Sequence, residues 1–342
     1  MHLTNEMIIE KSVEFSPLPV DYSVVHYRDC WVCALQTIFD TAAQFGLFYG
    51  LIVLGYVIAK VSGRGKVINK HLTFILIYLL IPLLFIYTLL TASPDTLLDI
   101  PLIVALVLLV LLLGPAFMYI RLWKRDIDDS TKGVFYLCVT FNNALFIPLP
   151  LVLMFIGSAG IPIIIIFSLT QMILLATLGS FMGAIYGSKT SQLSRIAKDA
   201  LTFPPFIAAI IALVLFTAQV RLTGDLASVF SFAGPLTTYL ALISVGVSIG
   251  VRFSLIDIRA ALEVVGIRQL LVPLITIPII ILSGLSHVTT SIIILEALMP
   301  PAVLTVVYAT SFELDAEKAA TIVTVGTLFL LPIIPFVSIL LG

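Results

Sequence analysis

The sequence is poor in charged residues, cysteine and histidine. Only 11% of its 342 residues are charged, and it contains three cysteines and four histidines. A soluble domain is about 25% charged and about 45–50% apolar, whereas the apolar fraction here is 60%. A formal net charge of −1 gives no sign of a nucleic-acid or acidic partner. This composition predicts an all-α, multi-pass membrane protein without a nucleic-acid partner.

The motifs of common catalytic and metal sites are also missing. There is no Walker loop, no H-E-x-x-H and no nucleophile elbow. Cys30 and Cys33 form one C-x-x-C without a second pair, which is a weak metal or redox signal. Asp126, Asp128 and Asp129 form an Asp-rich run of the kind that holds metal-diphosphate in membrane prenyltransferases, but neighbouring basic residues favour a solvated loop. We therefore expect no enzyme activity, no cofactor and no bound metal.

Ten apolar runs follow a polar leader, residues 1–40. The leader is acidic and lacks the pattern of a cleavable signal peptide, so we expect it to be mostly disordered or surface-lying, with residues 30–39 as a short amphipathic lead-in. Each later run is near the ~20 residues that cross a ~30 Å hydrocarbon core. The predicted spans are residues 41–60, 71–92, 100–122, 133–156, 161–186, 203–219, 226–250, 264–283, 288–311 and 319–341.

Lysine and arginine are concentrated in alternate loops between these runs. Counting Arg268 in the loop before the eighth span, 15 of the 18 basic residues lie on one side. Basic loops face the cytoplasm, so both termini are predicted to lie outside. The most polar internal stretch, residues 188–202, divides the chain into two five-span halves, residues 41–187 and 203–342.

The fourth span of each half is interrupted near its middle. Five spans per half place the second half upside down relative to the first, as in the inverted repeats of secondary transporters. Proline ends or kinks a helix, and a broken helix inside a membrane is tolerated only where it faces protein or a watery cavity. We therefore predict crossed broken helices 4 and 9 with a binding site between them. The candidate residues at the two breaks are Asn142, Asn143, Pro148, Pro150, Pro300 and Pro301.

Two further polar residues lie deep within predicted spans. Glu296 precedes the second break by one turn, and an acid at this depth usually has a function. It would be a proton carrier, a cation ligand or a substrate contact, or a hydrogen-bonded structural residue. Gln171 would form a wall of the pocket or an interhelical hydrogen bond. Half-helix N-termini favour an anion, but amides and carbonyls also bind cations, so residue type leaves the sign of the ligand open.

Several segments in a fixed order resemble the auxin efflux carrier family, which includes the plant PIN-FORMED transporters and prokaryotic relatives. They are LGYVIAK, LIYLLIPLLFIYTLL, NNALFIPLP followed by Gln171, FAGPLTTYLALISVGVSI, RQLLVPLITIPI, and LEALMPPAVLTVVYATSFELDAEKAATIVTVGTLFLLPIIPF. The resemblance covers about residues 41 to 342. The chain lacks the long central hydrophilic loop of many plant members and is more similar to prokaryotic ones. Glu296 also replaces what looks like an amide in plant members.

The resemblance implies a homodimeric secondary transporter with elevator-type alternating access. It implies export of small organic anions, an indole carboxylate in plant members and malate-like carboxylates in prokaryotic ones. It also implies that Asn142, Asn143, Gln171, Pro300 and Pro301 surround the substrate. Proton or sodium coupling through Glu296 is left open. The alternatives are a sodium-coupled symporter of the bile-acid type and a non-transporting membrane sensor on the same fold.

Overall fold

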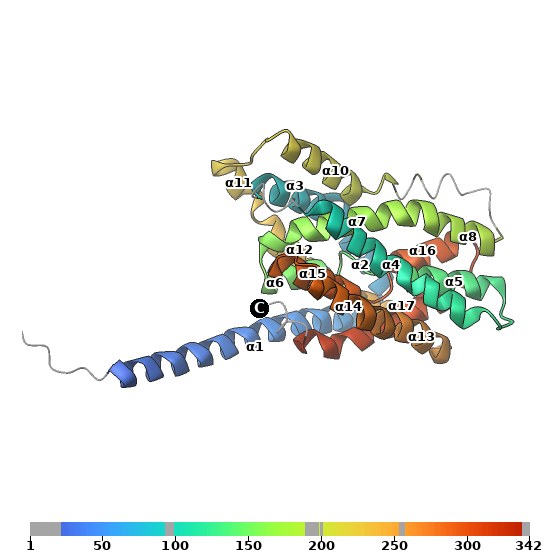
Figure 1. The fold of residues 1–342 in the computed structure, drawn as a ribbon, viewed down its shortest axis with the longest axis horizontal. Helices are drawn as coiled ribbons and strands as arrows, with labels where there is room; N and C mark the ends of the chain where they lie inside the picture. Colours follow the sequence, from blue (N-terminus) through green and yellow to red (C-terminus); the bar gives the residue numbers. More distant parts are fainter. Residues whose placement is uncertain (1–21, 93–98, 189–197, 199–200, 253–256, 337–342) are drawn as a thin grey trace, which may run out of the picture. The chain divides into compact units, whose positions relative to one another are not determined.

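The computed structural model describes residues 22–92, 99–188, 198, 201–252 and 257–336, and within them the chain is helical (Figure 1). These ranges contain no β-strand, and their one extended pairing is an isolated bridge between Asn142 and Pro301. The chain divides into two compact units, Met1–Gly46 and Leu47–Gly342. All contacts described below belong to the second unit.

The α-helices are interrupted by short π-helical and 3₁₀ turns. The α-helices are α1 (Tyr22–Ser62), α2 (Gly65–Ile75), α3 (Ile81–Thr91), α4 (Ile100–Leu122), α5 (Asp129–Thr140), α6 (Pro148–Phe155), α7 (Ile161–Leu174), α8 (Ser180–Tyr186), α10 (Pro204–Thr217), α11 (Gly224–Phe230), α12 (Ala233–Arg252), α13 (Ile258–Val265), α14 (Val272–Leu282), α15 (His287–Leu298), α16 (Val303–Ser311) and α17 (Ala316–Leu330). The turns are η1 (Leu76–Leu80), η3 (Ser158–Gly160), η4 (Leu175–Gly179), η6 (Gly266–Leu271) and η7 (Leu331–Ile333).

Seven helical stretches in the described ranges are long and apolar enough to cross a membrane. They are Ala42–Ser62, Gly65–Thr91, Ile100–Leu122, Ser158–Tyr186, Ala227–Val251, Ile258–Leu282 and Ala316–Phe336. They correspond to the predicted spans 1, 2, 3, 5, 7, 8 and 10, which confirms a multi-pass helical membrane protein.

The other three predicted spans are not single long helices. Spans 4 and 9 are the interrupted pairs α5–α6 and α15–α16, and span 6 is the 14-residue helix α10. At 1.5 Å per residue α10 is about 21 Å long, less than the ~30 Å hydrocarbon core. The ten-span count therefore stays a prediction.

Parts of the predicted plan lie outside the described residues. These are residues 1–21 of the leader, most of the 188–202 linker, the last residues of the tenth span and the side chains of Cys30 and Cys33. The helix α1 begins at Tyr22, upstream of the lead-in predicted for residues 30–39.

Two of the π-helical turns precede a proline. Pro82 and Pro273 are each the second residue of the helix that follows η1 or η6. Because proline has no N–H to donate to the preceding turn, the wider π-helical turn lets the helix continue past it. Long spans whose prolines are well separated therefore remain continuous, unlike the two segments with closely spaced pairs of prolines.

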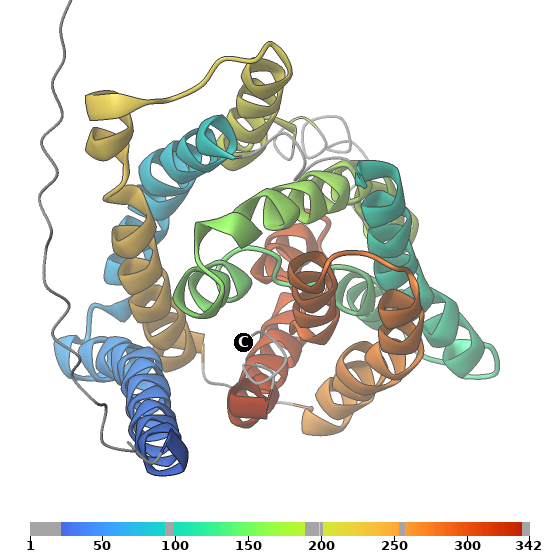
Figure 2. The same cartoon turned by 60° about the vertical axis from the view of Figure 1, so that its left-hand side comes forward.

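The helices of the second unit form two groups. In one, α10 packs on α3, and α12 packs on α2; in the other, α4 packs on α5 and α7, and α13 packs on α17. In Figure 2 the first group is blue to cyan (α2 and α3) and yellow to gold (α10 and α12), and the second is teal-green to light green (α4, α5 and α7) and orange to red (α13 and α17). The groups meet where α12 contacts α6 and where α3 contacts α7.

Glycines bring α1 and α12 into close contact. A Cβ atom built at Gly246 would lie 1.9 Å from the carbonyl oxygen of Ile52, and one at Gly55 would lie 2.1 Å from that of Ile243. No other residue fits at this distance. Small residues at a helix crossing are how membrane helices gain close packing without a hydrophobic driving force from water.

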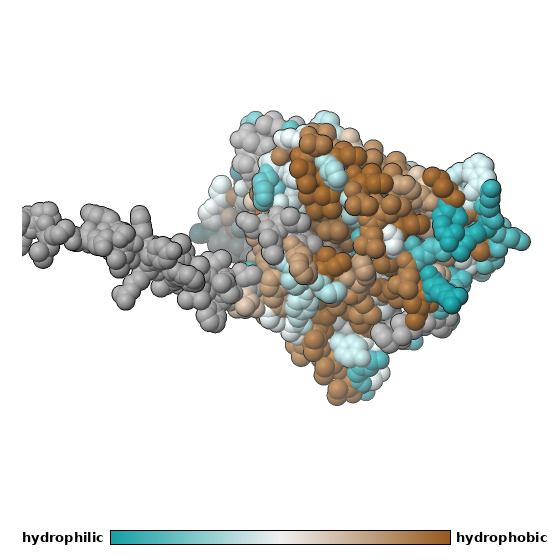
Figure 3. Space-filling view, turned by 60° about the horizontal axis from the view of Figure 1, so that its bottom comes forward, coloured by the Kyte–Doolittle hydropathy of each residue, from teal (hydrophilic) through white to brown (hydrophobic). Residues whose placement is uncertain are grey.

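Large apolar side chains cover much of the surface. Leu274 is 71% exposed and Leu282 is 85% exposed, and both belong to α14. Figure 3 shows a broad apolar surface on one face, with hydrophilic residues gathered toward its end. Contiguous apolar surface of this extent marks contact with lipid or protein rather than water, which agrees with membrane-spanning helices.

At the polar end, three aspartates cap three helices. Asp128 accepts from Thr131 N at 2.7 Å at the start of α5, and Asp315 accepts from Lys318 N at 2.9 Å at the start of α17. Asp257 caps α13 through Ala260 N. These side chains satisfy backbone donors that lack partners in the first helical turn.

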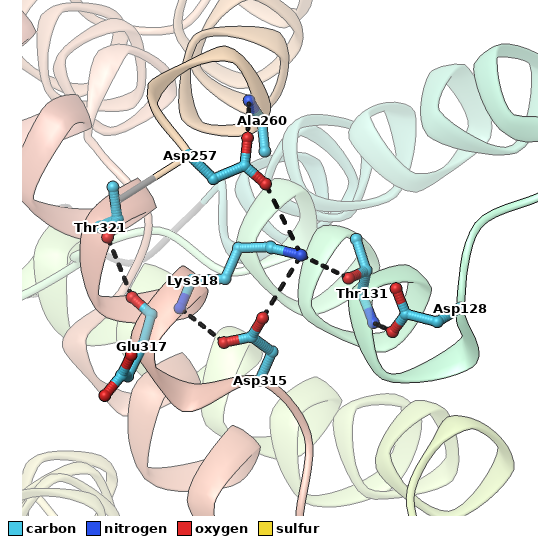
Figure 4. A network of polar contacts seen from close by, with 8 residues as sticks. All are labelled: Asp128, Thr131, Asp257, Ala260, Asp315, Glu317, Lys318 and Thr321. Atoms are coloured by element: carbon cyan, nitrogen blue, oxygen red, sulfur yellow. Dashed lines mark hydrogen bonds and ion pairs between the residues drawn. The ribbon is translucent and has the colours of Figure 1, made fainter. Parts of the chain in front are cut away.

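The side chain of Lys318 lies between these caps (Figure 4). Its Nζ donates to Thr131 Oγ1 at 2.6 Å and lies 3.3 Å from Asp315 Oδ2 and 3.7 Å from Asp257 Oδ2. Burial alone would raise the pKa of Asp128, but its hydrogen bonds from Thr131 and the charge of Lys318 lower it below the ordinary value. The predicted Asp-rich loop therefore contributes a helix cap, and Asp129 pairs with Lys132 at 3.0 Å.

Candidate functional site

The two interrupted segments pair through their backbones. The α5 helix ends at Thr140, and α15 ends at Leu298. Between these ends and the helices that follow, Asn143 N donates to Pro300 O at 2.8 Å, and Ala302 N donates to Phe141 O at 2.8 Å. Peptide groups freed by the breaks thus find partners inside the protein, as a non-aqueous interior requires.

Gln171 of α7 completes the pairing on the other side of Asn142. Its Oε1 accepts from Asn142 N at 3.1 Å, and its Nε2 donates to Asn142 O at 2.8 Å. The side-chain amide therefore imitates a neighbouring strand. Gln171 is only 5% exposed, so this pair of hydrogen bonds forms away from water, where an unpaired peptide group is costly.

Glu296 fixes the orientation of the Asn142 side chain. Asn142 Nδ2 donates at 2.9 Å to both the backbone oxygen and the Oε2 of Glu296. Because both partners are acceptors, the amide nitrogen must face them. The Asn142 NH₂ group is therefore occupied inside the protein.

A cavity of about 240 Å³ lies beside this crossing. It is bounded by α2 and α12 from the first helix group and by the break after α5, by α7 and by α16 from the second. An apolar cavity of about 150 Å³ holds a benzene molecule, so this one has room for a small ring with a polar substituent. Its polar side chains are Asn69, Thr73, Asn142, Asn143, Ser168, Gln171, Ser244 and Ser248.

The structure brings some of the predicted site residues to the cavity and leaves others behind it. Asn142, Asn143 and Gln171 line it. The lining residues in the described ranges do not include Pro148, Pro150, Glu296, Pro300 or Pro301. Pro148 and Pro150 begin α6, and Glu296 is completely buried. These five residues shape the crossing.

Five polar residues at the cavity were not among the candidates from the sequence: Ser168 of α7 and two pairs of residues on α2 and α12. Asn69 and Thr73 share one face of α2, and Ser244 and Ser248 share one face of α12. Ser244 Oγ donates to Asn69 Oδ1 at 3.4 Å. Each pair has i, i+4 spacing, which places both members on one helix face. This i, i+4 spacing of small polar residues within apolar runs is the sequence pattern that could have identified these four residues.

Asn143 is the amide best placed to contact a ligand. Its Oδ1 accepts from Phe146 N at 3.1 Å, and no hydrogen bond from its Nδ2 is found within the described part of the chain. Asn143 also lines a second cavity of about 30 Å³, together with Thr324 and Thr327 of α17. It therefore borders both the large cavity and a smaller one, which is big enough for a water molecule.

A basic pocket adjoins the large cavity. It is lined by Lys66, Lys70 and Val251, and it shares Asn69 and Thr73 with the large cavity. Both lysines are exposed at the start of α2. Positive charge at the mouth of a low-dielectric cavity raises the local concentration of anions.

Comparison with known proteins identifies the family. The sequence profile described as Membrane transport protein matches residues 48–194 and 188–338, nearly the whole chain. This chain belongs to the Membrane transport protein family. The auxin efflux carrier resemblance is thereby confirmed, and the chain is a multi-pass membrane transporter.

Two archaeal relatives carry the same general description. An uncharacterized transporter of Methanothermobacter thermautotrophicus is 25% identical over 291 residues, which is 85% of this chain and 95% of the relative. An uncharacterized transporter of Methanocaldococcus jannaschii is 23% identical over 211 residues, which is 61% of this chain and 68% of the relative.

Proposed function

We propose that this protein is a secondary active transporter that exports small organic anions, such as auxin-like or other carboxylates. The observation that carries the proposal is the cavity of about 240 Å³ beside the paired breaks, with the free amide nitrogen of Asn143 at its wall. Membrane-embedded sites of secondary transporters lie where broken helices meet. Asn143 Nδ2, with the hydroxyls of Thr73 and Ser248, would hold the carboxylate, while the apolar walls hold its organic part.

The charge at the cavity mouth supports an anionic substrate. Lys66 and Lys70 line the adjoining pocket, and Asn142 cannot serve as the main donor because its NH₂ group contacts Glu296. Both lysines lie at the start of α2, on the side that the basic-residue asymmetry assigns to the cytoplasm. The cavity would then receive its substrate from the cytoplasm, as an exporter requires, with both termini outside.

The movement would be an elevator-type exchange of access. The two matches of one family profile support a repeat, with residues 41–187 and 203–342 as its halves and 188–202 as the linker. An inverted 5+5 arrangement would cross the broken spans 4 and 9 where Asn142 and Pro301 pair. The group α4–α8 with α13–α17 would move against the group of α2, α3, α10 and α12. Many such carriers are homodimers, and we propose the same here.

A sodium-coupled symporter of the bile-acid type is the second candidate. It is favoured by Glu296, a buried acid directly beside the paired breaks. Carboxylate and carbonyl oxygens are the ligands that hard cations prefer, and both kinds of oxygen are present there. Sodium-dependent ligand binding would favour this candidate.

Thermal-shift measurements on the purified protein test the proposal. The protein is heated with a panel of small carboxylates, including indole-3-acetate and malate, with sodium and with choline in its place. A ligand that binds the folded state raises the free energy of unfolding by mass action, by about 2.7 kcal/mol at 100 times its Kd. The melting temperature rises as a result. We expect at least one carboxylate to stabilise the protein without sodium.

Asn143→Ala is the matched variant for that screen. It should fold and lose the stabilisation by the carboxylate. Stabilisation by sodium alone would support the symporter. No stabilisation by any carboxylate, or an unchanged response in the variant, would contradict the proposed site.

A further inference from the structure

Two predictions from the sequence disagree about Arg268: the predicted eighth span, residues 264–283, contains it, but the count of basic residues placed it in the preceding loop. It was counted in a cytoplasmic loop, but it lies in η6, inside the apolar stretch Ile258–Leu282, and is 0% exposed. The loop assignment was wrong because the helical stretch begins at Ile258, before the predicted start of the span at residue 264, so Arg268 lies well inside it. Fourteen of the 18 basic residues still lie on the predicted cytoplasmic side, so the asymmetry survives.

The guanidinium of Arg268 has no hydrogen-bond acceptor within the described part of the chain. Its Nε, Nη1 and Nη2 are all buried and unpartnered. The same holds for two acceptor atoms of the crossing, Glu296 Oε1 and Asn142 Oδ1. Buried polar atoms nearly always have a hydrogen-bond partner. Arg268 has donors without acceptors, and the other two residues have acceptors without donors, so each could supply what the other lacks.

Arg268 and Glu296 lie on helical segments that pack together, because η6 contacts α15. Within the described part of the chain no direct ion pair joins them, and the polar partner of the Glu296 carboxyl group is Asn142. The adjacent Gln269 joins η6 to the end of α15, because its Nε2 donates to Leu298 O at 3.3 Å. A buried water molecule between the two charged groups would satisfy both, as such waters commonly do.

Other charged groups on the helices packed against η6 have different surroundings. Glu263 of α13 pairs with Arg121 and Arg125, and Lys132 of α5 pairs with Asp129. Arg259 is exposed, and His287 begins α15 at its exposed end. The thiol of Cys138 contacts Thr305 Oγ1. Arg268 therefore has Glu296 as its counter-charge.

We propose that Arg268 is a positioning residue, the built-in cation of this crossing. Its fixed positive charge balances Glu296, keeps the carboxylate ionised and so holds the Asn142 amide toward it. The balance makes a bound sodium ion or a proton on Glu296 unnecessary. This inference rests on the proposed function only where it says that transport needs no sodium ion or proton on Glu296. The charge pair itself can be tested without any substrate.

The energetic reason is the cost of a lone charge inside a membrane. A single ionised side chain there is expensive, and removing one partner of a buried pair is far more damaging than replacing both. An opposite charge that belongs to the protein stabilises Glu296 in every state of the transport cycle. A sodium ion or a proton would have to bind and leave.

The test compares the melting temperatures of R268Q, E296Q, the double variant R268Q/E296Q and the control R268K. Each is measured from about pH 5 to pH 8, with sodium chloride and with choline chloride. We expect either single neutralisation to lower the melting temperature by roughly 5–15 °C at neutral pH, and the double variant to recover most of that loss.

The pH profile separates this role from simple packing. In R268Q a buried Glu296 without a counter-charge must be protonated, so the variant should lose stability as pH rises, and sodium should partly restore it. The wild type, R268K and the double variant should show neither effect. Because R268Q and the double variant share all surface groups, their difference isolates Glu296.

Three results would overturn the inference. One is a stabilising effect of sodium on the wild type. Another is a pH profile of R268Q that matches that of the double variant. The third is a double variant as unstable as the sum of the single ones. Failure of every carboxylate to bind would instead contradict the proposed function and leave the charge pair intact.

Discussion

Two polar networks of this protein lie at helix ends in opposite surroundings. At the crossing, Asn142 and Glu296 are completely buried among apolar helices. At the polar end, Lys318 lies among Asp257 and Asp315, whose side chains are 43% and 37% exposed. Both networks satisfy backbone groups at helix ends.

The difference lies in what water can replace. At the polar end a lost hydrogen bond is exchanged for one with water, so each bond contributes little to stability. At the crossing water cannot reach the freed groups, so a broken partner leaves a full desolvation cost. We infer that the crossing determines the fold of the site, whereas the polar end contributes only a small part of the protein's stability.

The largest effect is expected for Asn142→Leu. This change preserves side-chain size but removes the donor to Glu296 Oε2. It also removes one of two donors to the Glu296 backbone oxygen, which still accepts from Met299 N at 3.2 Å. The expected loss of stability is about 2–5 kcal/mol, measured by denaturation in mild detergent. A loss no greater than that of Lys318→Met would remove the contrast between the networks.

Asn143→Ala should separate binding from stability. It removes the free Nδ2 donor and one hydrogen bond to Phe146 N, so we expect the free energy of unfolding to change by about 1 kcal/mol. Affinity for a carboxylate should fall roughly 10- to 100-fold, because hydrogen bonds to charged groups contribute about 1.5–3 kcal/mol. Titration of the variant with the stabilising carboxylate measures this, and unchanged affinity would move the site elsewhere.

Lys318→Met should have a smaller effect on stability. The variant loses the bond to Thr131 Oγ1 and the ion pairs with Asp315 and Asp257. Partly exposed pairs of this kind contribute about 0–1 kcal/mol each, and salt weakens them. Unfolding should be measured at low and high salt. The difference in free energy of unfolding between the wild type and Lys318→Met should become smaller as ionic strength rises. A loss of several kcal/mol would mean that this network, too, is inaccessible to water.

The smallest effect is expected for the pH dependence of the Asp128 cap. Its folded pKa lies below the ordinary value, chiefly through hydrogen bonds from Thr131 that overcome the effect of burial. Its contribution is therefore present above the unfolded pKa and is lost as pH falls through the folded one. Asp128→Ala should cost about 1 kcal/mol at neutral pH.

Asp128→Asn is the control for that variant. Asparagine also caps helices well, so it should keep most of the stability while losing the acid-dependent part. Equal acid sensitivity in the wild type and Asp128→Asn would assign that sensitivity to another group.

The sequence predicted the crossing better than the cavity. Proline pairs and amides within apolar runs are rare, so Asn142, Asn143 and Gln171 stand out from the residue pattern by itself. Asn69 and Ser244 do not, because small polar residues are common in membrane helices and only tertiary packing brings α2 and α12 to face the breaks. Arg268 was misplaced because hydropathy sets span edges only to within a few residues.

Uptake by proteoliposomes tests the central claim most directly. Purified wild type, Asn143→Ala and Lys318→Met are reconstituted, and uptake of labelled indole-3-acetate and malate is followed with no sodium gradient. The account predicts uptake of at least one carboxylate by the wild type and Lys318→Met, and a loss of roughly tenfold or more in Asn143→Ala. Uptake no faster than in empty liposomes, or equal uptake by all three proteins, would contradict it.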